Sequence, residues 1–127
     1  MASERFRTTV VRSYSSGTPG RALCQARDQH FVVDDYAYNG GPGEALGAGE
    51  AFLSGISACA VNMLERLARE SGMPLRWTDV TVEGTRDSEA TPIHENLSVY
   101  DAVHLHFDLT GPDDDQAQEL VETYKRR

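Results

Sequence analysis

The pattern of apolar and polar positions is that of short strands in the first third of the chain. Stretches rich in Thr, Val and aromatic residues (RFRTTVVRSY, RALCQAR and HFVVDD) alternate with turns such as SSGTPG. Short apolar runs that are interrupted by Gly, Pro and Ser are typical of antiparallel strands joined by tight turns. We therefore predict a three-stranded antiparallel meander over residues 5–35.

From Gly49 to Ser71 the pattern changes to that of a helix, which follows a glycine-rich loop at residues 39–49. The first half of this helix, EAFLSGISACAV, has almost no polar face, so we expect it to be buried on several sides. The second half, NMLERLARES, is amphipathic. Gly72 and Pro74 are expected to end the helix.

Strands return after the helix. RWTDVTVEG alternates as a strand, SEATPIHEN is a predicted loop, and LSVYDAVHLHFDLTG is a longer predicted strand. One face of this longer strand is apolar and consists of Val103, Leu105, Phe107 and Leu109.

The acidic run GPDDDQAQE, followed by YKRR, predicts a closing helix. Acidic residues 113–115 are expected at its cap and first turn, and basic residues 125–127 in its last turn, an order that suits the helix macrodipole. Strands, a central helix, further strands and a closing helix predict a single α+β domain over residues 1–127.

Composition and charge exclude several classes of protein. The 127 residues carry a net charge of −8, which argues against nucleic acid as a partner because its phosphates favour clusters of Lys and Arg. No apolar run approaches the roughly 18 residues of a membrane span. The N-terminal MASERFRTTVV lacks the layout of a secretion signal, and two cysteines without framework spacing are typical of a reducing compartment. We therefore expect a cytoplasmic protein with free thiols.

Two parts of the sequence are candidate ligand sites. His104, His106 and Asp108 alternate on one strand face and have the spacing of metal ligands, but they fit the solvent side of a half-buried strand better. His30 and His94 have no identifiable partner in the sequence. The glycine-rich loop precedes a helix but lacks the GxxxxGK[ST] and GxGxxG patterns of nucleotide sites. We expect neither a metal nor a nucleotide; a mobile loop beside a site and a plain connection both stay open.

The two cysteines lead to different predictions. Cys24 lies in the strand RALCQAR with Leu and Ala around it, and it is predicted to pack. Cys59 lies within SGISACAV, where a small buried thiol is the ordinary interpretation. A reactive thiolate needs nearby cations or a helix N-terminus, and Cys59 is too deep in its helix for the terminus to help. Activation would have to come from another segment or another chain.

The ordered set of segments resembles the OsmC/Ohr superfamily, the osmotically inducible protein C and organic hydroperoxide resistance proteins. The resemblance covers HFVVDD, then GGPGEALGAGEAFLSGISACAVNMLERLARESGMPLRWTDVTVEG, then VHLHFDLTGPDDDQAQELVETYKRR. Its most specific element is the glycine-rich loop leading to Glu50, with a cysteine nine residues further along the helix. It implies an intertwined homodimer with two active sites at the subunit interface and no bound cofactor.

The resemblance also implies residue roles. Members reduce organic hydroperoxides and hydrogen peroxide with a helix cysteine, and Cys59 is the matching position. A glutamate and an arginine hold the thiolate and the peroxide, which implies Glu50 and an arginine of the N-terminal strands. Arg21 is our choice for that arginine, while Arg12 and Arg27 remain open.

Helix geometry bears on the implied dimer. Nine residues at about 100° each place Glu50 on the opposite helix face from Cys59, about 13 Å away along the axis. Glu50 is therefore expected to serve the Cys59 of a partner subunit across a two-fold axis, in a dimer with paired central helices.

The chain departs from the family layout in one respect. The usual resolving cysteine, in a Cys-Pro context after the final helix, has no counterpart up to Arg127. We therefore expect an external small thiol as the reductant. Three readings stay open: a one-cysteine hydroperoxide reductase, an inactive relative that binds an apolar ligand or serves in assembly, and another thiol-dependent enzyme. Alkyl or lipid hydroperoxides would suit an apolar pocket, although core packing explains the same side chains: Phe52, Leu53, Ile56 and Met63.

Overall fold

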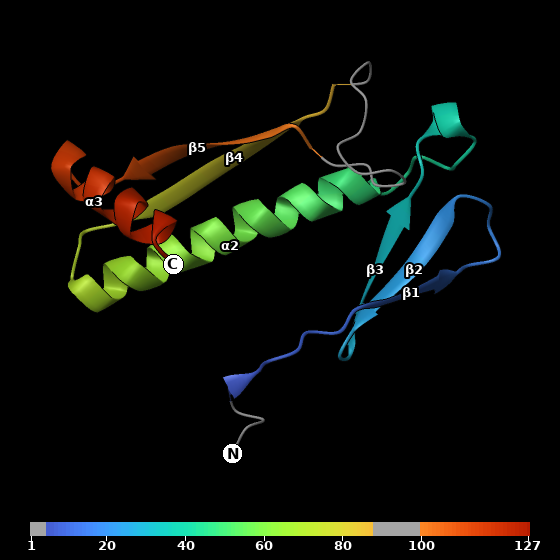
Figure 1. Cartoon of the computed structure of the whole chain (residues 1–127), viewed down its shortest axis with the longest axis horizontal. Coiled ribbons are helices and arrows are strands. Elements are labelled where there is room, and N and C mark those ends of the chain that lie inside the picture. Colours follow the sequence, from blue (N-terminus) through green and yellow to red (C-terminus); the bar gives the residue numbers. More distant parts are fainter. Residues whose placement is uncertain (1–4, 88–99) are drawn as a thin grey trace. The chain divides into compact units, whose positions relative to one another are not determined.

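Antiparallel strands, a long central helix and a closing helix make up the computed structural model, which describes residues 5–87 and 100–127 (Figure 1). Three strands and a short 3-10 helix, η1 (Ala37–Asn39), precede the central helix, and two strands and a last helix follow it. The α+β fold predicted from the sequence is therefore confirmed. The chain divides into two compact units, the first ending at Ala51 and the second beginning at Phe52.

The first unit contains the predicted antiparallel meander of β1 (Arg12–Ser15), β2 (Arg21–Ala26) and β3 (Gln29–Asp34), in that order. β1 is shorter than the stretch RFRTTVVRSY predicted. Arg12 pairs with Gln25 and β2 ends at Ala26, so the residues before Arg12 have almost no opposing strand left to pair with. Without that pairing Val10 and Val11 stay exposed.

The central helix, α2 (Ala48–Ser71), begins one residue before the predicted start and ends where the sequence predicts. Its end is a Schellman motif, in which Gly72 adopts a left-handed φ of 70°. The N–H of Gly72 donates to the carbonyl of Arg69, and the N–H of Met73 donates to the carbonyl of Ala68. Glycine fits this position because it has no Cβ to oppose a positive φ.

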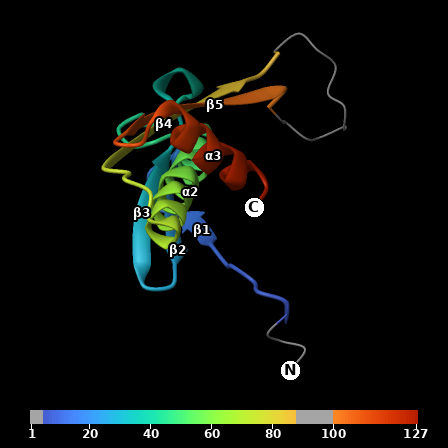
Figure 2. The same ribbon diagram turned by 90° about the vertical axis from the view of Figure 1, so that its left-hand side faces the viewer.

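The second unit holds the apolar core. The strands β4 (Trp77–Thr85) and β5 (Ala102–Thr110) pair antiparallel, and they lie with the later part of α2 and with α3 (Asp114–Lys125) in both views (Figures 1 and 2). The buried core residues come from the two helices: Leu64, Leu67, Ala68 and Leu120.

The β5 strand confirms the predicted alternation of its faces. Leu105, Phe107 and Leu109 are half-buried, whereas Val103, on the same face nearer the start of the strand, stays 39% exposed. The strand is shorter than LSVYDAVHLHFDLTG, because it begins at Ala102. The predicted loop SEATPIHEN and residues 97–99 lie outside the described residues.

The start of α3 follows the sequence closely. Asp113 is the N-cap, and its side chain and that of Gln116 form a reciprocal capping box. Asp114 and Asp115 occupy the first turn as predicted. At the other end only Lys125 lies in the helix, since Arg126 is the C-cap and its N–H donates to the carbonyl of Thr123 in a tightened last turn. The expectation that all three basic residues lie in the last turn is therefore wrong.

The described helices include none that is both long and apolar enough to cross a membrane.

Candidate functional site

The two cysteines occupy opposite environments. Cys24 on β2 is 3% exposed, and its sulfur accepts a hydrogen bond from Ser13 Oγ at 3.2 Å. Its predicted packing role is confirmed. Cys59 on α2 is exposed and free. The thiol that solvent and solutes reach in a single chain is therefore Cys59.

Within one chain, the first half of α2 is not buried on several sides, so the predicted burial would need a covering surface from outside that chain. Phe52 is 60% exposed and Cys59 is exposed, whereas Ala60 is fully buried. The apolar pattern had indicated that something covers this half of the helix, and the described residues of one chain leave much of it open. A second polypeptide or an apolar ligand is the physical alternative.

Glu50 lies in the first turn of α2, where a carboxylate is favoured by the partial positive charge of the helix N-terminus. Its Oε1 accepts the backbone N–H of Gly47 at 2.9 Å. Gly47 itself is buried against Tyr36, and an added Cβ would come within 2.6 Å of the Tyr36 ring and hydroxyl. The loop can therefore approach the tyrosine closely enough to present this N–H to Glu50.

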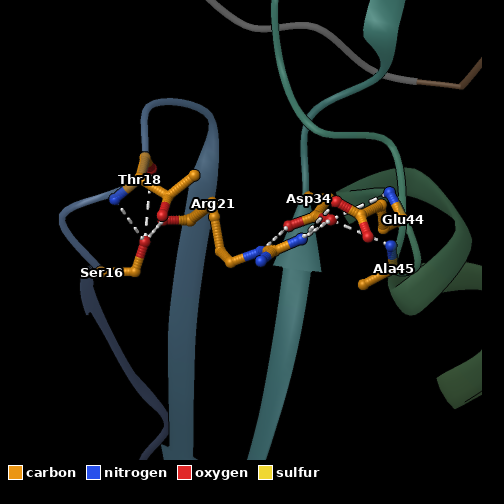
Figure 3. Close-up of polar contacts among 6 residues, drawn as sticks. All are labelled: Ser16, Thr18, Arg21, Asp34, Glu44 and Ala45. Carbon is orange, nitrogen blue, oxygen red and sulfur yellow. Dashed lines mark hydrogen bonds and ion pairs between the residues drawn. The ribbon is translucent and has the colours of Figure 1, made fainter.

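Arg21, the first residue of β2, forms a two-pronged ion pair with Asp34, the last residue of β3 (Figure 3). Its Nε lies 2.8 Å from Asp34 Oδ1 and its Nη2 lies 2.9 Å from Oδ2. Nη2 also lies 3.6 Å from Glu44 Oε1. Ser16 Oγ donates to the Arg21 carbonyl at 2.9 Å, which fixes the backbone that carries the guanidinium.

The Asp34 carboxylate accepts hydrogen bonds from two segments of the chain, the start of β2 and the loop before α2. Besides the guanidinium, its Oδ2 accepts the N–H of Glu44 at 3.0 Å and the N–H of Ala45 at 2.9 Å, and its side chain is 0% exposed. The bonds from Arg21 and from these N–H groups hold the pKa of the Asp34 carboxyl well below its usual range. Asp34 in turn raises the pKa of the Arg21 guanidinium above its ordinary value. We call Arg21, Asp34, Glu44 and Ala45 the Asp34 clasp.

The OsmC-like protein family matches residues 41–127, which is more than half of the chain and includes Glu50 and Cys59. This chain belongs to the OsmC-like family. The match does not reach Arg21 or Asp34, so the clasp joins a segment outside the matched region to Glu44 and Ala45 inside it.

Solved structures resemble this OsmC-like protein in fold. An OsmC-like protein from Mycoplasma pneumoniae has a TM-score of 0.80 at 15% identity, with 95% of this chain and 82% of that chain covered. An organic hydroperoxide resistance protein OsmC from Legionella pneumophila has a TM-score of 0.67 at 23% identity, covering 91% and 80%. The organic hydroperoxide resistance protein OhrB of Bacillus subtilis has a TM-score of 0.58 at 19% identity, covering 91% and 82%. A comparison with curated proteins finds no match to this sequence.

The other two arginines considered in this OsmC-like protein make different contacts. The Arg12 guanidinium lies 4.4 Å from the centre of the Tyr14 ring, and its Nη1 is 3.5 Å from Gln25 Oε1. Arg27 lies between β2 and β3 with a left-handed φ of 54°. Of these three arginines, Arg21 is the one held by carboxylates among the described residues, which fixes the direction of its guanidinium.

The polar face of β5 is exposed, as predicted for the solvent side of a strand. His104, His106 and Asp108 all lie there, and His106 Nε2 is 3.4 Å from Glu83 Oε1 on the neighbouring strand. Among the residues the structure describes, no group of three or more His, Cys, Asp or Glu side chains is placed to hold a metal ion. His94 lies outside those residues.

The clasp predicts an acid-sensitive contribution to stability. Because the pKa of Asp34 is lower in the folded chain than in the unfolded one, its stabilising effect is complete above the unfolded pKa of about 3.9 and is lost as the pH falls through the folded pKa. We expect the Tm of the unmodified protein to exceed that of Asp34→Asn by several degrees at neutral pH. The gap should narrow below about pH 4. Thermal unfolding of both proteins from neutral pH to about pH 2 measures it, and a gap that is constant throughout would contradict the assignment.

Proposed function

We propose that this OsmC-like protein reduces organic hydroperoxides, with Cys59 as the reacting thiol. The observation that carries the proposal is the exposed Cys59 in the apolar half of α2, at the position of the helix cysteine that the family resemblance implies. The names of the Legionella pneumophila and Bacillus subtilis structures support a role in peroxide stress.

The proposed chemistry is a two-electron transfer. The Cys59 thiolate attacks one peroxide oxygen, an S–O bond forms and the O–O bond breaks, so that the sulfur is oxidised to a sulfenic acid. The departing alkoxide takes a proton and leaves as an alcohol. The substrate class is alkyl or lipid hydroperoxides, because Phe52 and Ile56 precede Cys59 on α2 and offer apolar surface to an organic group.

An external small thiol is the proposed reductant. One thiol condenses with the sulfenic acid to a mixed disulfide and water, and a second thiol releases Cys59 by exchange. Cys24 is a poor resolving group because it is 3% exposed and its sulfur is hydrogen-bonded to Ser13. A reducing compartment such as the cytoplasm would supply such a thiol and keep Cys24 free.

Glu50 and Arg21 are the proposed partners of the thiolate and the peroxide. The bonds of Arg21 to Asp34 use Nε and Nη2, and its side chain is 28% exposed, so Nη1 is the nitrogen that we assign to the reacting groups. A guanidinium that is already held by a carboxylate loses little freedom when it binds a further anion. Glu50 has a fixed direction because Oε1 is tied to Gly47, which leaves Oε2 for a proton or a peroxide hydroxyl.

We propose that the active form is a homodimer in which Glu50 serves the Cys59 of the partner subunit. The described part of the first unit buries just one apolar side chain, Cys24, while Phe31, Tyr38 and Leu46 stay exposed. A three-stranded sheet needs more buried apolar surface than this to be stable. The exposed apolar face around Phe52 on α2 would also be buried in such a dimer.

The dimer predicts a mass of twice 14.0 kDa in solution at the concentrations used for activity. Light scattering coupled to size exclusion measures that mass, and each fraction is assayed for peroxide consumption. Activity should follow the dimer fraction as the protein is diluted. A monomer that retains full activity would refute the shared site while leaving Cys59 as the reacting thiol.

A second candidate is an OsmC-fold protein that binds an apolar ligand and has no peroxidase activity. The observation that favours it is the neutralisation of Arg21 by Asp34 and Glu44, which weakens its attraction for a thiolate. This candidate predicts a sluggish Cys59 and a Cys59→Ser protein that binds as well as the original.

A peroxide-consumption assay separates the candidates. Cumene hydroperoxide and hydrogen peroxide are each offered with dithiothreitol or with a dihydrolipoyl thiol as the reductant. The proposed function predicts that cumene hydroperoxide is consumed faster than hydrogen peroxide. It also predicts that Cys59 forms a sulfenic acid, which a dimedone-type probe traps. Alkylation of Cys59 by other electrophiles, with peroxide turnover at background, would indicate a different thiol-dependent enzyme.

A further inference from the structure

We infer that Asp34 is a positioning residue of the candidate site, which fixes Arg21 and the residues leading to Glu50 in one arrangement. The inference rests on the proposed function, since Arg21 and Glu50 matter to it as partners of the Cys59 chemistry. No role was predicted for Asp34 from the sequence.

Asp34 holds the Arg21 side chain in one position. Both carboxylate oxygens of Asp34 are engaged by the guanidinium, at 2.8 and 2.9 Å, and this planar pairing fixes the orientation of the side chain as well as its position (Figure 3). The backbone is fixed too, because Arg21 and Asp34 pair in the β2–β3 register. Asp34 therefore determines where Nη1 of Arg21 points.

Asp34 also holds the loop that precedes α2. Asp34 Oδ2 accepts the N–H groups of Glu44 and Ala45, and the Asp34 N–H donates to the carbonyl of Leu46 at 2.9 Å. Three consecutive loop residues are thus tied to a single residue of the sheet. The next residue is Gly47, whose N–H holds Glu50 Oε1 at 2.9 Å and whose carbonyl accepts the N–H of Ala51.

Burial makes this arrangement specific for a carboxylate. Asp34 is 1% exposed, and all four groups around its side-chain oxygens are donors. An amide in its place would present an NH₂ group to at least one of these donors, and the unpaired donors would be left away from water. A shift of about 1 Å in either partner is enough to reduce the rate of a positioned reaction strongly.

The test compares Asp34→Asn with Asp35→Asn, its neighbour in the chain. Asp35 is exposed, and its Oδ1 accepts from the Tyr36 N–H and from Asn39 Nδ2, so it provides a control of the same chemistry outside the clasp. Two quantities are measured well below the Tm of each protein. They are kcat/KM for cumene hydroperoxide and the pH dependence of Cys59 alkylation by iodoacetamide.

We expect Asp34→Asn to lower kcat/KM by about 10- to 100-fold, mainly through kcat, and Asp35→Asn to change it by less than about twofold. The alkylation profile of Asp34→Asn should move to higher pH, because the displacement of Arg21 away from the thiolate outweighs the gain in net positive charge when the Asp34 carboxylate is removed. In an Arg21→Gln background, Asp34→Asn should shift that profile little further. A full additional shift would show that Asp34 does not act through Arg21.

If Asp34→Asn does not fold, Arg21→Lys is the variant that tests the inference. Lysine keeps the charge but loses the two-pronged geometry, so the same shift in the alkylation profile is expected, at reduced size. An Asp34→Asn protein that is less stable but has the alkylation profile of Asp35→Asn would overturn the inference, because a merely structural residue behaves in this way. Failure of the proposed function would give a different result. In that case Cys59→Ser would consume peroxide as fast as the wild-type protein.

Discussion

Cys59→Ser is expected to reduce thiol-dependent consumption of cumene hydroperoxide to background, a loss of about 10³-fold or more. A serine hydroxyl at this position is not ionised near neutral pH and cannot accept an oxygen atom as a sulfur does. The fold should be unaffected, because Cys59 is exposed in the chain. Coupled spectrophotometric assays with dithiothreitol, and circular dichroism of the same samples, measure both expectations.

Cys24→Ser is the matched control. The substitution is chemically identical, but it lies on β2 under the hydroxyl of Ser13, so we expect turnover to be retained and a modest fall in Tm. If Cys24→Ser lost turnover while Cys59→Ser stayed active, the reacting thiol would be Cys24 and not Cys59. Unchanged turnover in both variants would end the peroxidase proposal.

Leu64→Ala is expected to cause the largest loss of stability of any single aliphatic truncation in the second unit, about 2–5 kcal/mol in the free energy of unfolding. Leu64 is fully buried on α2 and belongs to the same core cluster as Leu67 and Leu120. The loss combines the transfer of the removed methyl groups with the cavity they leave. Urea unfolding followed by circular dichroism measures it as a lower midpoint at an unchanged m-value.

Leu46→Ala makes the same chemical change at a side chain that is 53% exposed. We expect a loss below about 0.5 kcal/mol, because surface truncations of this kind rarely exceed it. Equal losses for the two leucines would mean that Leu46 is covered in the assembled protein. That result would itself support the proposed dimer.

Much of the fold was predictable because the signals are local. The meander follows from turns that are only a few residues long, and α2 follows from a helical pattern that Gly72 and Pro74 terminate. The predicted start of β1 was wrong, because the length of β1 depends on how many residues of β2 are left to pair with it. A local sequence pattern contains no information on that number. The prediction of one domain over residues 1–127 stays a prediction.

The candidate site was predictable in part, from the resemblance rather than from local chemistry. Cys59 is exposed on α2 as a reacting thiol requires, but the roles of Glu50 and Arg21 stay predictions. The predicted burial of the first half of α2 stays a prediction, because one chain leaves it open and an apolar pattern does not tell whether the covering surface belongs to the same molecule.

The Asp34 clasp was missed although the sequence contains a signal for it. Arg21 and Asp34 are equally distant from the Arg27–Asp28 turn, so a β2–β3 hairpin in simple register must place them opposite each other, as it does. An acidic residue at the end of an apolar strand, paired with an arginine across the hairpin, is a cross-strand ion pair by register alone. The contacts with Glu44 and Ala45 have no such signal, because they depend on the path of the glycine-rich loop.

The uneven distribution of buried side chains has a consequence for biosynthesis. The meander leaves the ribosome before the second unit does, and its described residues bury little apolar surface, whereas the core of Leu64, Leu67 and Leu120 is complete only when α3 has been made. During synthesis the N-terminal strands therefore keep unpaired edges and exposed apolar side chains until the rest of the chain has been made. Slow translation after residue 51 would prolong that wait, and chaperone binding during synthesis should concentrate on the exposed Phe31 and Val32 of β3.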